Sequence, residues 1–68
     1  MTTVNDWVDA ALIERVLGEY REMPGLTLTM EQARRLWGCD AEICRRVIEV
    51  LVARGVLRWS RDGFLIRA

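Results

Sequence analysis

Apolar residues recur along the first third of this chain at the spacing of one long helix. Positions three and four apart form a continuous stripe, which predicts a helix over residues 6–22. Asn5 is the expected N-cap, and Asp6 suits the first turn. The helix is expected to stop at Pro24, because proline disfavours helical backbone in the residue before it. The stripe consists of Val8, Ala11, Leu12, Ile13, Val16, Leu17 and Tyr20.

A shorter helix is predicted over residues 30–37, after a brief extended segment. Thr29 can cap its first backbone N–H groups, and Gln32, three positions later, completes the pattern of a capping box. Gly38 is expected to end the helix. The inner face is predicted to carry Met30, Ala33 and either Leu36 or Trp37.

A third helix is predicted over residues 41–54, with Asp40 as its N-cap. Its inner stripe is Cys44, Ile48 and Leu51, at spacings of four and three. Gly55 is expected to close it, because glycine takes the left-handed conformation without the strain that other residues meet.

Two short β-type runs follow and predict a hairpin over residues 56–67. Asp62 and Gly63 lie between them, and this pair is typical of tight turns that need positive backbone φ angles. The whole chain, residues 1–68, is therefore expected to be one mostly α domain of α+β class, with a small antiparallel sheet.

Composition supports a single small core. Hydrophobic residues make up 51% of the 68 residues, which argues against disorder. No apolar run is long enough to span a bilayer, and residues 1–7 lack the features of a signal peptide, so we expect a cytoplasmic protein without membrane contact. The spacing of Cys39 and Cys44 matches none of the known zinc-ligand patterns, and the chain has no histidine, so no metal is expected. The two thiols are interpreted as buried apolar groups.

The distribution of charge says more than its total. Ten arginines balance ten acidic residues, so the net charge is zero. Residues 1–27 hold two arginines and five acidic residues, a net of −3, whereas residues 28–68 hold eight and five, a net of +3. This asymmetry favours an anionic partner for the second part of the chain.

The order helix, short extended segment, helix, tight turn, helix and hairpin resembles the winged helix-turn-helix family. The resemblance is carried by "LTMEQARRLWGCDAEICRRVIEVLVARGVL" and the hairpin "RWSRDGFLIR". Leu28 and Thr29 match the start of the motif's first helix, and Gly38 matches its turn. A Leu-x-x-x-Gly-x-Leu pattern ends the second helix, at Leu51, Gly55 and Leu57. The resemblance implies a three-helix winged fold and double-stranded DNA as partner, in a small transcriptional regulator.

In that family the second helix of the motif lies in the major groove and the wing contacts the backbone or minor groove. Carried over to this sequence, the resemblance implies base contacts from the third helix and phosphate contacts from the second helix and the wing. However, the motif region carries a net charge of only +1, which predicts weak DNA binding by a monomer. The implied DNA-binding residues are Thr29, Arg34, Arg35, Glu42, Arg45, Arg46 and Arg61.

A protein-interaction module of the same fold is the alternative. Ile43, Val47 and Val50 form a second apolar band on the third helix, which either packs in the core or meets a partner. Trp7 is a further interface candidate. Self-association would double the charge presented to DNA, so a homodimer is compatible with either function.

Enzymatic activity is not expected. The chain has no histidine, no nucleophile paired with a base at a recognisable spacing and no glycine-rich phosphate loop, so no cofactor is expected either. The carboxylates of Glu14, Glu19 and Glu22, interleaved with Arg15 and Arg21, are interpreted as a solvated helix face.

Overall fold

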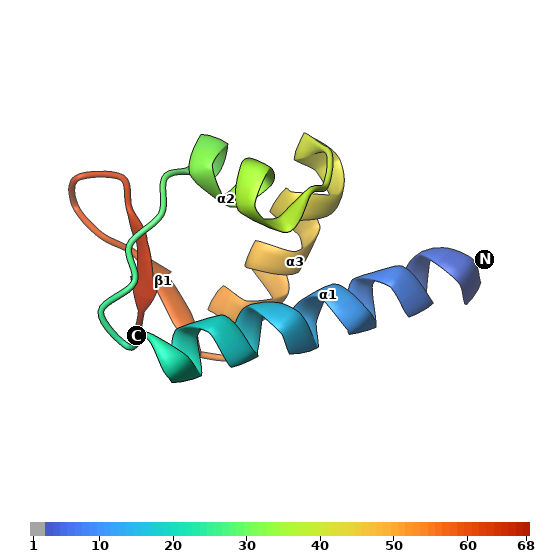
Figure 1. Ribbon diagram of the computed structural model, residues 1–68, viewed down its shortest axis with the longest axis horizontal. Coiled ribbons are helices and arrows are strands. Elements are labelled where there is room, and N and C mark those ends of the chain that lie inside the picture. Colours follow the sequence, from blue (N-terminus) through green and yellow to red (C-terminus); the bar gives the residue numbers. More distant parts are fainter. Residues whose placement is uncertain (1–2) are drawn as a thin grey trace.

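Three helices are followed by a two-stranded antiparallel sheet, an α+β layout compatible with the winged-helix shape (Figure 1). The computed structural model describes the backbone of residues 3–68 and the side chains of residues 10–68. The molecule measures 35 × 20 × 19 Å. Within the described part, none of the helices combines the length and apolar character that crossing a bilayer demands.

Helix α1 spans Thr3–Glu22 and lies along one side of the molecule (Figure 1). It ends where Pro24 predicts, but it begins three residues before residue 6. The predicted N-cap at Asn5 is therefore wrong: Asn5 lies inside the helix, and no proline or glycine stands before it to stop a further turn. From Leu12 on, the buried side chains follow at intervals of four, at Leu12, Val16 and Tyr20.

Helix α2 spans Met30–Trp37, with the predicted bounds. The Gln32 backbone N–H donates to Thr29 Oγ1 at 3.1 Å, and the Thr29 N–H donates to Gln32 Oε1 at 2.9 Å, so the capping box is present. Gly38 ends the helix with φ +65°, a conformation that glycine adopts without steric cost. Trp37, 3% exposed, takes the inner position and Leu36, 41% exposed, does not.

Helix α3 spans Ala41–Ala53, begins at the predicted cap Asp40 and ends one residue earlier than expected. The Asp40 carboxylate accepts from the Ile43 N–H at 2.9 Å. At the other end, the N–H groups of Gly55 and Val56 donate to the carbonyls of Val52 and Leu51, which is the Schellman pattern. Gly55 has φ +76°, the left-handed conformation predicted for it.

The hairpin consists of β1, Leu57–Trp59, and β2, Leu65–Arg67. Leu57 pairs with Arg67 and Trp59 with Leu65. The predicted hairpin is present, but Asp62 lacks the positive φ angle that the Asp-Gly pattern suggests: in the described backbone only glycines have positive φ, among them Gly63 at +89°.

The loop closes instead through Ser60. Its carbonyl accepts from the Gly63 N–H at 3.1 Å and its N–H donates to the Phe64 carbonyl at 2.7 Å, while its hydroxyl accepts from the Phe64 N–H at 3.0 Å. This arrangement is a three-residue turn that ends in a left-handed glycine. Arg61 and Asp62 therefore form the exposed tip.

The core lies between the three helices and one face of the hairpin. α1, α2 and β1 all pack on α3. Leu28 adds a short extended pairing to Leu65, with N–H to carbonyl distances of 2.7 and 3.2 Å. The buried apolar residues are Leu12, Val16, Tyr20, Leu28, Ala33, Trp37, Cys44, Val47, Ile48, Leu51, Leu57 and Leu65.

Candidate nucleic-acid interface

The outer face of α3 carries four charged side chains side by side. Glu42, Arg45, Arg46 and Glu49 recur at spacings of three, one and three, so they share one side of the helix, and together they line a shallow depression of about 140 Å³. Glu42, Arg45 and Glu49 are exposed. Arg46 is half-buried and already has an interaction partner within the molecule. Arg45 is therefore the arginine of this face with the freest access to a groove.

At the start of α2, the Thr29 hydroxyl already accepts one hydrogen bond within the protein. Thr29 Oγ1 accepts from the Gln32 N–H, but the hydroxyl hydrogen is a donor of its own. Thr29 is half-buried, so this hydrogen remains within reach of solvent. The geometry allows the contact with a phosphate oxygen that the family resemblance implies for Thr29.

Arg34 and Arg35 lie in the last turn of α2 and are both exposed. The Arg34 carbonyl accepts from the N–H groups of Gly38 and Cys39, at 2.9 and 3.3 Å, which fixes the backbone at the turn into α3. Their guanidinium groups thus extend from a rigid part of the molecule, next to the turn.

The hairpin carries three exposed arginines, Arg58, Arg61 and Arg67. Arg61 is at the tip beside Asp62, as expected from the sequence. Arg58, which the sequence analysis did not include, points outward from β1 next to the buried Leu57. The alternation of buried and exposed positions along a strand is the signal that predicts this orientation.

Few of these charges are neutralised internally. Between described side chains, the ion pair found joins Arg15 and Glu19, at 3.3 Å. Apart from Arg46, the arginines of α2, α3 and the hairpin have no hydrogen bond or ion pair through their guanidinium groups to a described residue. Of the eight arginines outside α1, seven therefore have no ion pair with a residue that the structure describes.

The Arg15 and Glu19 pair is not the solvated surface that the sequence suggested. Arg15 donates to the Leu36 carbonyl at 2.7 Å and to the Trp37 carbonyl at 3.4 Å. Glu19 accepts from the Trp37 indole N–H at 2.9 Å. These side chains therefore hold the C-terminal end of α2 against α1, a role that spacing along one helix does not reveal.

The apolar band of α3 packs mainly inward. Val47 has no exposed surface and belongs to the core, while Val50 is half-buried. Ile43 is partly buried and borders a hollow of about 410 Å³ between α1, the end of α2 and the start of α3. The side chain of Trp7 lies outside the described residues. Ile43 and Val50 are thus the members of the band with surface to offer a partner.

The two cysteines are free thiols on either side of the α3 N-cap. Cys39 precedes Asp40 and Cys44 lies four residues after it, the positions that pack together in a hydrophobic staple. Burial, together with the neighbouring Cys39, raises the pKa of the Cys44 thiol to about 12. The Cys44 thiol therefore stays protonated at neutral pH and acts as an apolar group.

Comparison of the chain with protein-family profiles, curated proteins and solved structures gives no match. Any functional assignment for this chain therefore depends on its own geometry and charge.

Proposed function

We propose that this domain binds double-stranded DNA as a small winged-helix transcriptional regulator, with α3 in the major groove. The observation that carries the proposal is a set of exposed guanidinium groups without an ion pair to any described residue, those of Arg34, Arg35, Arg45, Arg58 and Arg61. Phosphate neutralisation by such groups supplies most of the affinity of nonspecific DNA binding.

Base contacts are assigned to the exposed face of α3. A helix of 13 residues is roughly 20 Å long and enters a major groove about 12 Å wide. Arg45 has the planar donor fork that pairs with guanine O6 and N7, and Glu42 can accept from a cytosine amino group. Arg46 contributes less in this proposal, because it is half-buried and already partnered.

Phosphate contacts are assigned to the residues around this helix. Thr29, Arg34 and Arg35 flank the start and end of α2, and Arg58 and Arg61 belong to the wing. The net charge of zero still limits the affinity, and we expect nonspecific dissociation constants of about 10⁻⁴ to 10⁻⁶ M.

Fluorescence anisotropy with a labelled duplex of mixed sequence tests the proposal, at low and at moderate salt. We expect binding that weakens steeply with salt, and a loss in Arg45→Ala of roughly tenfold on duplexes that offer Arg45 a guanine, with a smaller loss on other sequences. Arg54→Ala is the matched control, because Arg54 is an exposed arginine at the C-cap of α3, away from the Glu42 to Glu49 face. An absence of binding at low salt, or equal losses in the two variants, contradicts the proposal.

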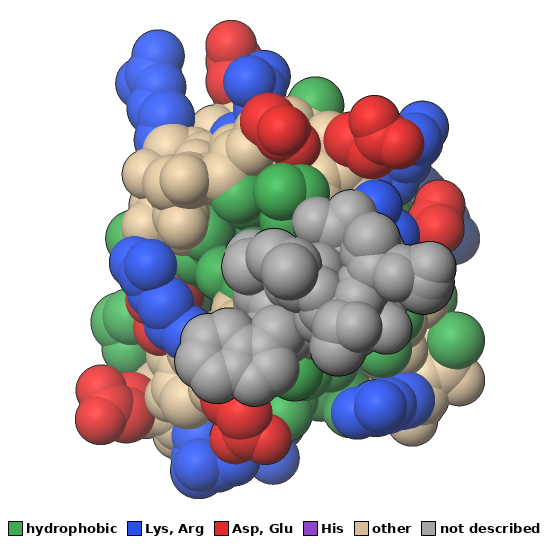
Figure 2. Space-filling model, turned by 90° about the vertical axis from the view of Figure 1, so that its right-hand side faces the viewer, with side chains coloured by type: hydrophobic (Ala, Val, Ile, Leu, Met, Phe, Trp, Pro, Cys, Tyr) green, Lys and Arg blue, Asp and Glu red, His purple; other side chains and the backbone are tan. Residues whose placement is uncertain are grey.

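A protein-interaction module is the second candidate, favoured by the hollow beside Ile43. Ala11, Leu12 and Trp37 give this hollow an apolar lining. Figure 2 shows the end of the molecule where α1 begins and α2 turns into α3, with hydrophobic side chains visible on this face and charges of both signs around its rim. Sedimentation analysis distinguishes the candidates. A dimer that Ile43→Ser disrupts, in a protein without affinity for DNA, supports an interaction module.

A further inference from the structure

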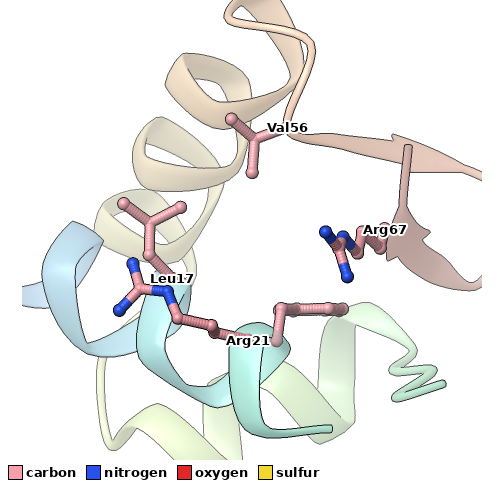
Figure 3. A pocket seen from close by; sticks show the side chains of 5 residues that line it. Leu17, Arg21, Val56 and Arg67 are labelled. Carbon is pink, nitrogen blue, oxygen red and sulfur yellow. The ribbon is translucent and has the colours of Figure 1, made fainter. Parts of the chain in front are cut away.

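A second hollow lies on another part of the molecule, between the C-terminal half of α1, the connection from α3 to β1 and strand β2 (Figure 3). Its volume is about 200 Å³. Leu17 and Val56, both half-buried, and the buried ring of Tyr20 give it an apolar lining. The Tyr20 hydroxyl points elsewhere, because it donates to the Leu65 carbonyl at 2.7 Å.

Two arginines from distant parts of the chain complete the hollow. Figure 3 shows Arg67 extending from β2 into the space beneath Val56, and Arg21 lying along α1 beside Leu17 on the other side. Both residues are exposed, and neither guanidinium has a hydrogen bond or ion pair with any residue that the structure describes. Among the described residues that line the hollow, none is acidic.

This combination of charge and shape is selective. The guanidinium groups of Arg67 and Arg21 lie on two sides of the hollow and give it a positive potential, which favours an anionic ligand. A guanidinium fork matches two oxygens of a carboxylate or of a phosphate, and the carboxylate, with its smaller charge, loses less hydration beside an apolar lining. The apolar lining in turn favours a ligand with a hydrocarbon body, which leaves water on binding.

We propose that this hollow binds a small organic carboxylate with an apolar body, its carboxylate held by Arg67 and Arg21 and its hydrocarbon part packed on Leu17, Val56 and Tyr20. The proposal does not depend on DNA binding, because Arg21 and Arg67 are not among the residues assigned to DNA. A ligand at this place contacts both the last turns of α1 and the second strand of the hairpin.

Titration of the ¹⁵N-labelled protein with hexanoate, followed by NMR, tests the proposal. We expect the largest shifts at the amides of Leu17, Arg21, Val56 and Arg67. Acetate carries the charge without the hydrocarbon chain, and 1-hexanol carries the chain without the charge, so each is expected to bind much more weakly. Inorganic phosphate is the third comparison, since it can pair with the same guanidinium groups but lacks the apolar body.

Substitutions distinguish binding in this hollow from a general attraction of the carboxylate to exposed arginines. Arg67→Gln and Arg21→Gln are each expected to weaken hexanoate binding roughly three- to tenfold. Arg54→Gln removes an exposed arginine elsewhere and is expected to leave the affinity unchanged. The spectra also report whether each variant keeps its fold. Equal binding of acetate, phosphate or hexanol, shifts spread over all arginines, or unchanged affinity in Arg67→Gln overturns the proposal.

Discussion

At the scale of single residues, the Glu19 carboxylate connects α1 with the end of α2. One oxygen accepts from the Trp37 indole N–H at 2.9 Å, and the other pairs with Arg15, which itself binds the Leu36 carbonyl. Trp37 is 3% exposed, so its N–H has little access to water as a replacement partner. The contact therefore stabilises the position of α2, and with it the turn that leads into α3.

Replacing Glu19 by alanine is expected to lower the free energy of unfolding by about 1–3 kcal/mol, because the indole N–H of Trp37 is left without its acceptor. Urea denaturation followed by tryptophan fluorescence measures the change. Glu22→Ala is the matched control, since Glu22 is exposed, and it should stay within about 0.5 kcal/mol of the parent. Similar values for the two variants would show that the Glu19 contact contributes little.

Tyr20 connects α1 with the hairpin, because its hydroxyl donates to the Leu65 carbonyl. Its ionisation makes the stability of the protein depend on pH. Burial, and to a smaller extent the Glu19 carboxylate, raises the pKa of Tyr20 to about 12, against 10.0 for a free tyrosine. Folding therefore favours the protonated phenol. Its contribution to stability is complete below pH 10 and is lost as the pH rises through about 12.

Tyr20→Phe isolates this contribution. At pH 7 the variant is expected to lose about 1 kcal/mol, the usual net value of one hydrogen bond. Between pH 10 and 12 the parent protein should lose about 2 kcal/mol more than the variant, so the difference between them shrinks or reverses. Denaturation curves across this range provide the measurement, and both proteins retain the Cys44 thiol as a common background. Parallel pH profiles would exclude a role for the phenol.

At the scale of the elements, helix ends are the part of the fold that the sequence predicts best. Thr29, Gln32 and Asp40 act on backbone groups only three residues away, so their roles follow from the local sequence. The hairpin loop was predicted less well, because its geometry depends on Ser60, which bonds to Phe64 across the turn.

The candidate site also contains features that the local sequence predicts and features that depend on the rest of the fold. Helical and strand periodicity places Arg45 and Arg58 outside without knowledge of the rest of the fold. The partial burial of Arg46 and the inward packing of Val47 depend on what lies beside α3 in space. Residues such as Arg15 and Glu19, whose partners are about 20 residues away, have no local signal that distinguishes them from a solvated surface.

Thr29 allows the local part of this argument to be tested. Thr29→Ala removes the acceptor for the Gln32 N–H and is expected to cost about 1 kcal/mol of stability. Thr29→Ser keeps the hydroxyl and should retain most of that stability. Thermal unfolding followed by circular dichroism compares the three proteins. If serine is as destabilising as alanine, the methyl group rather than the capping hydroxyl is what stabilises the start of α2.

At the scale of the whole molecule, the net charge is zero, but the acidic and basic residues are unevenly distributed along the chain. Residues 1–27 carry two arginines against five acidic residues, and residues 28–68 carry eight against five. The acidic part is mostly α1, which packs on α3 from the side opposite its exposed face. An anionic polymer is therefore attracted to one part of the molecule and repelled by the other, so it binds in a preferred orientation.

The salt dependence of DNA binding separates the arginines by role. Each neutralised phosphate contributes about −0.9 to the slope of log K against log salt concentration. Arg34→Gln or Arg61→Gln, assigned to phosphates, should reduce the slope by about 1 and weaken binding equally on different duplexes. Arg45→Gln, assigned to a base, should instead reduce discrimination between sequences, by about 1–3 kcal/mol at the contacted base pair. Equal effects of all three substitutions on the slope and on sequence preference would mean that α3 does not enter the groove and that the arginines act only as a diffuse positive field.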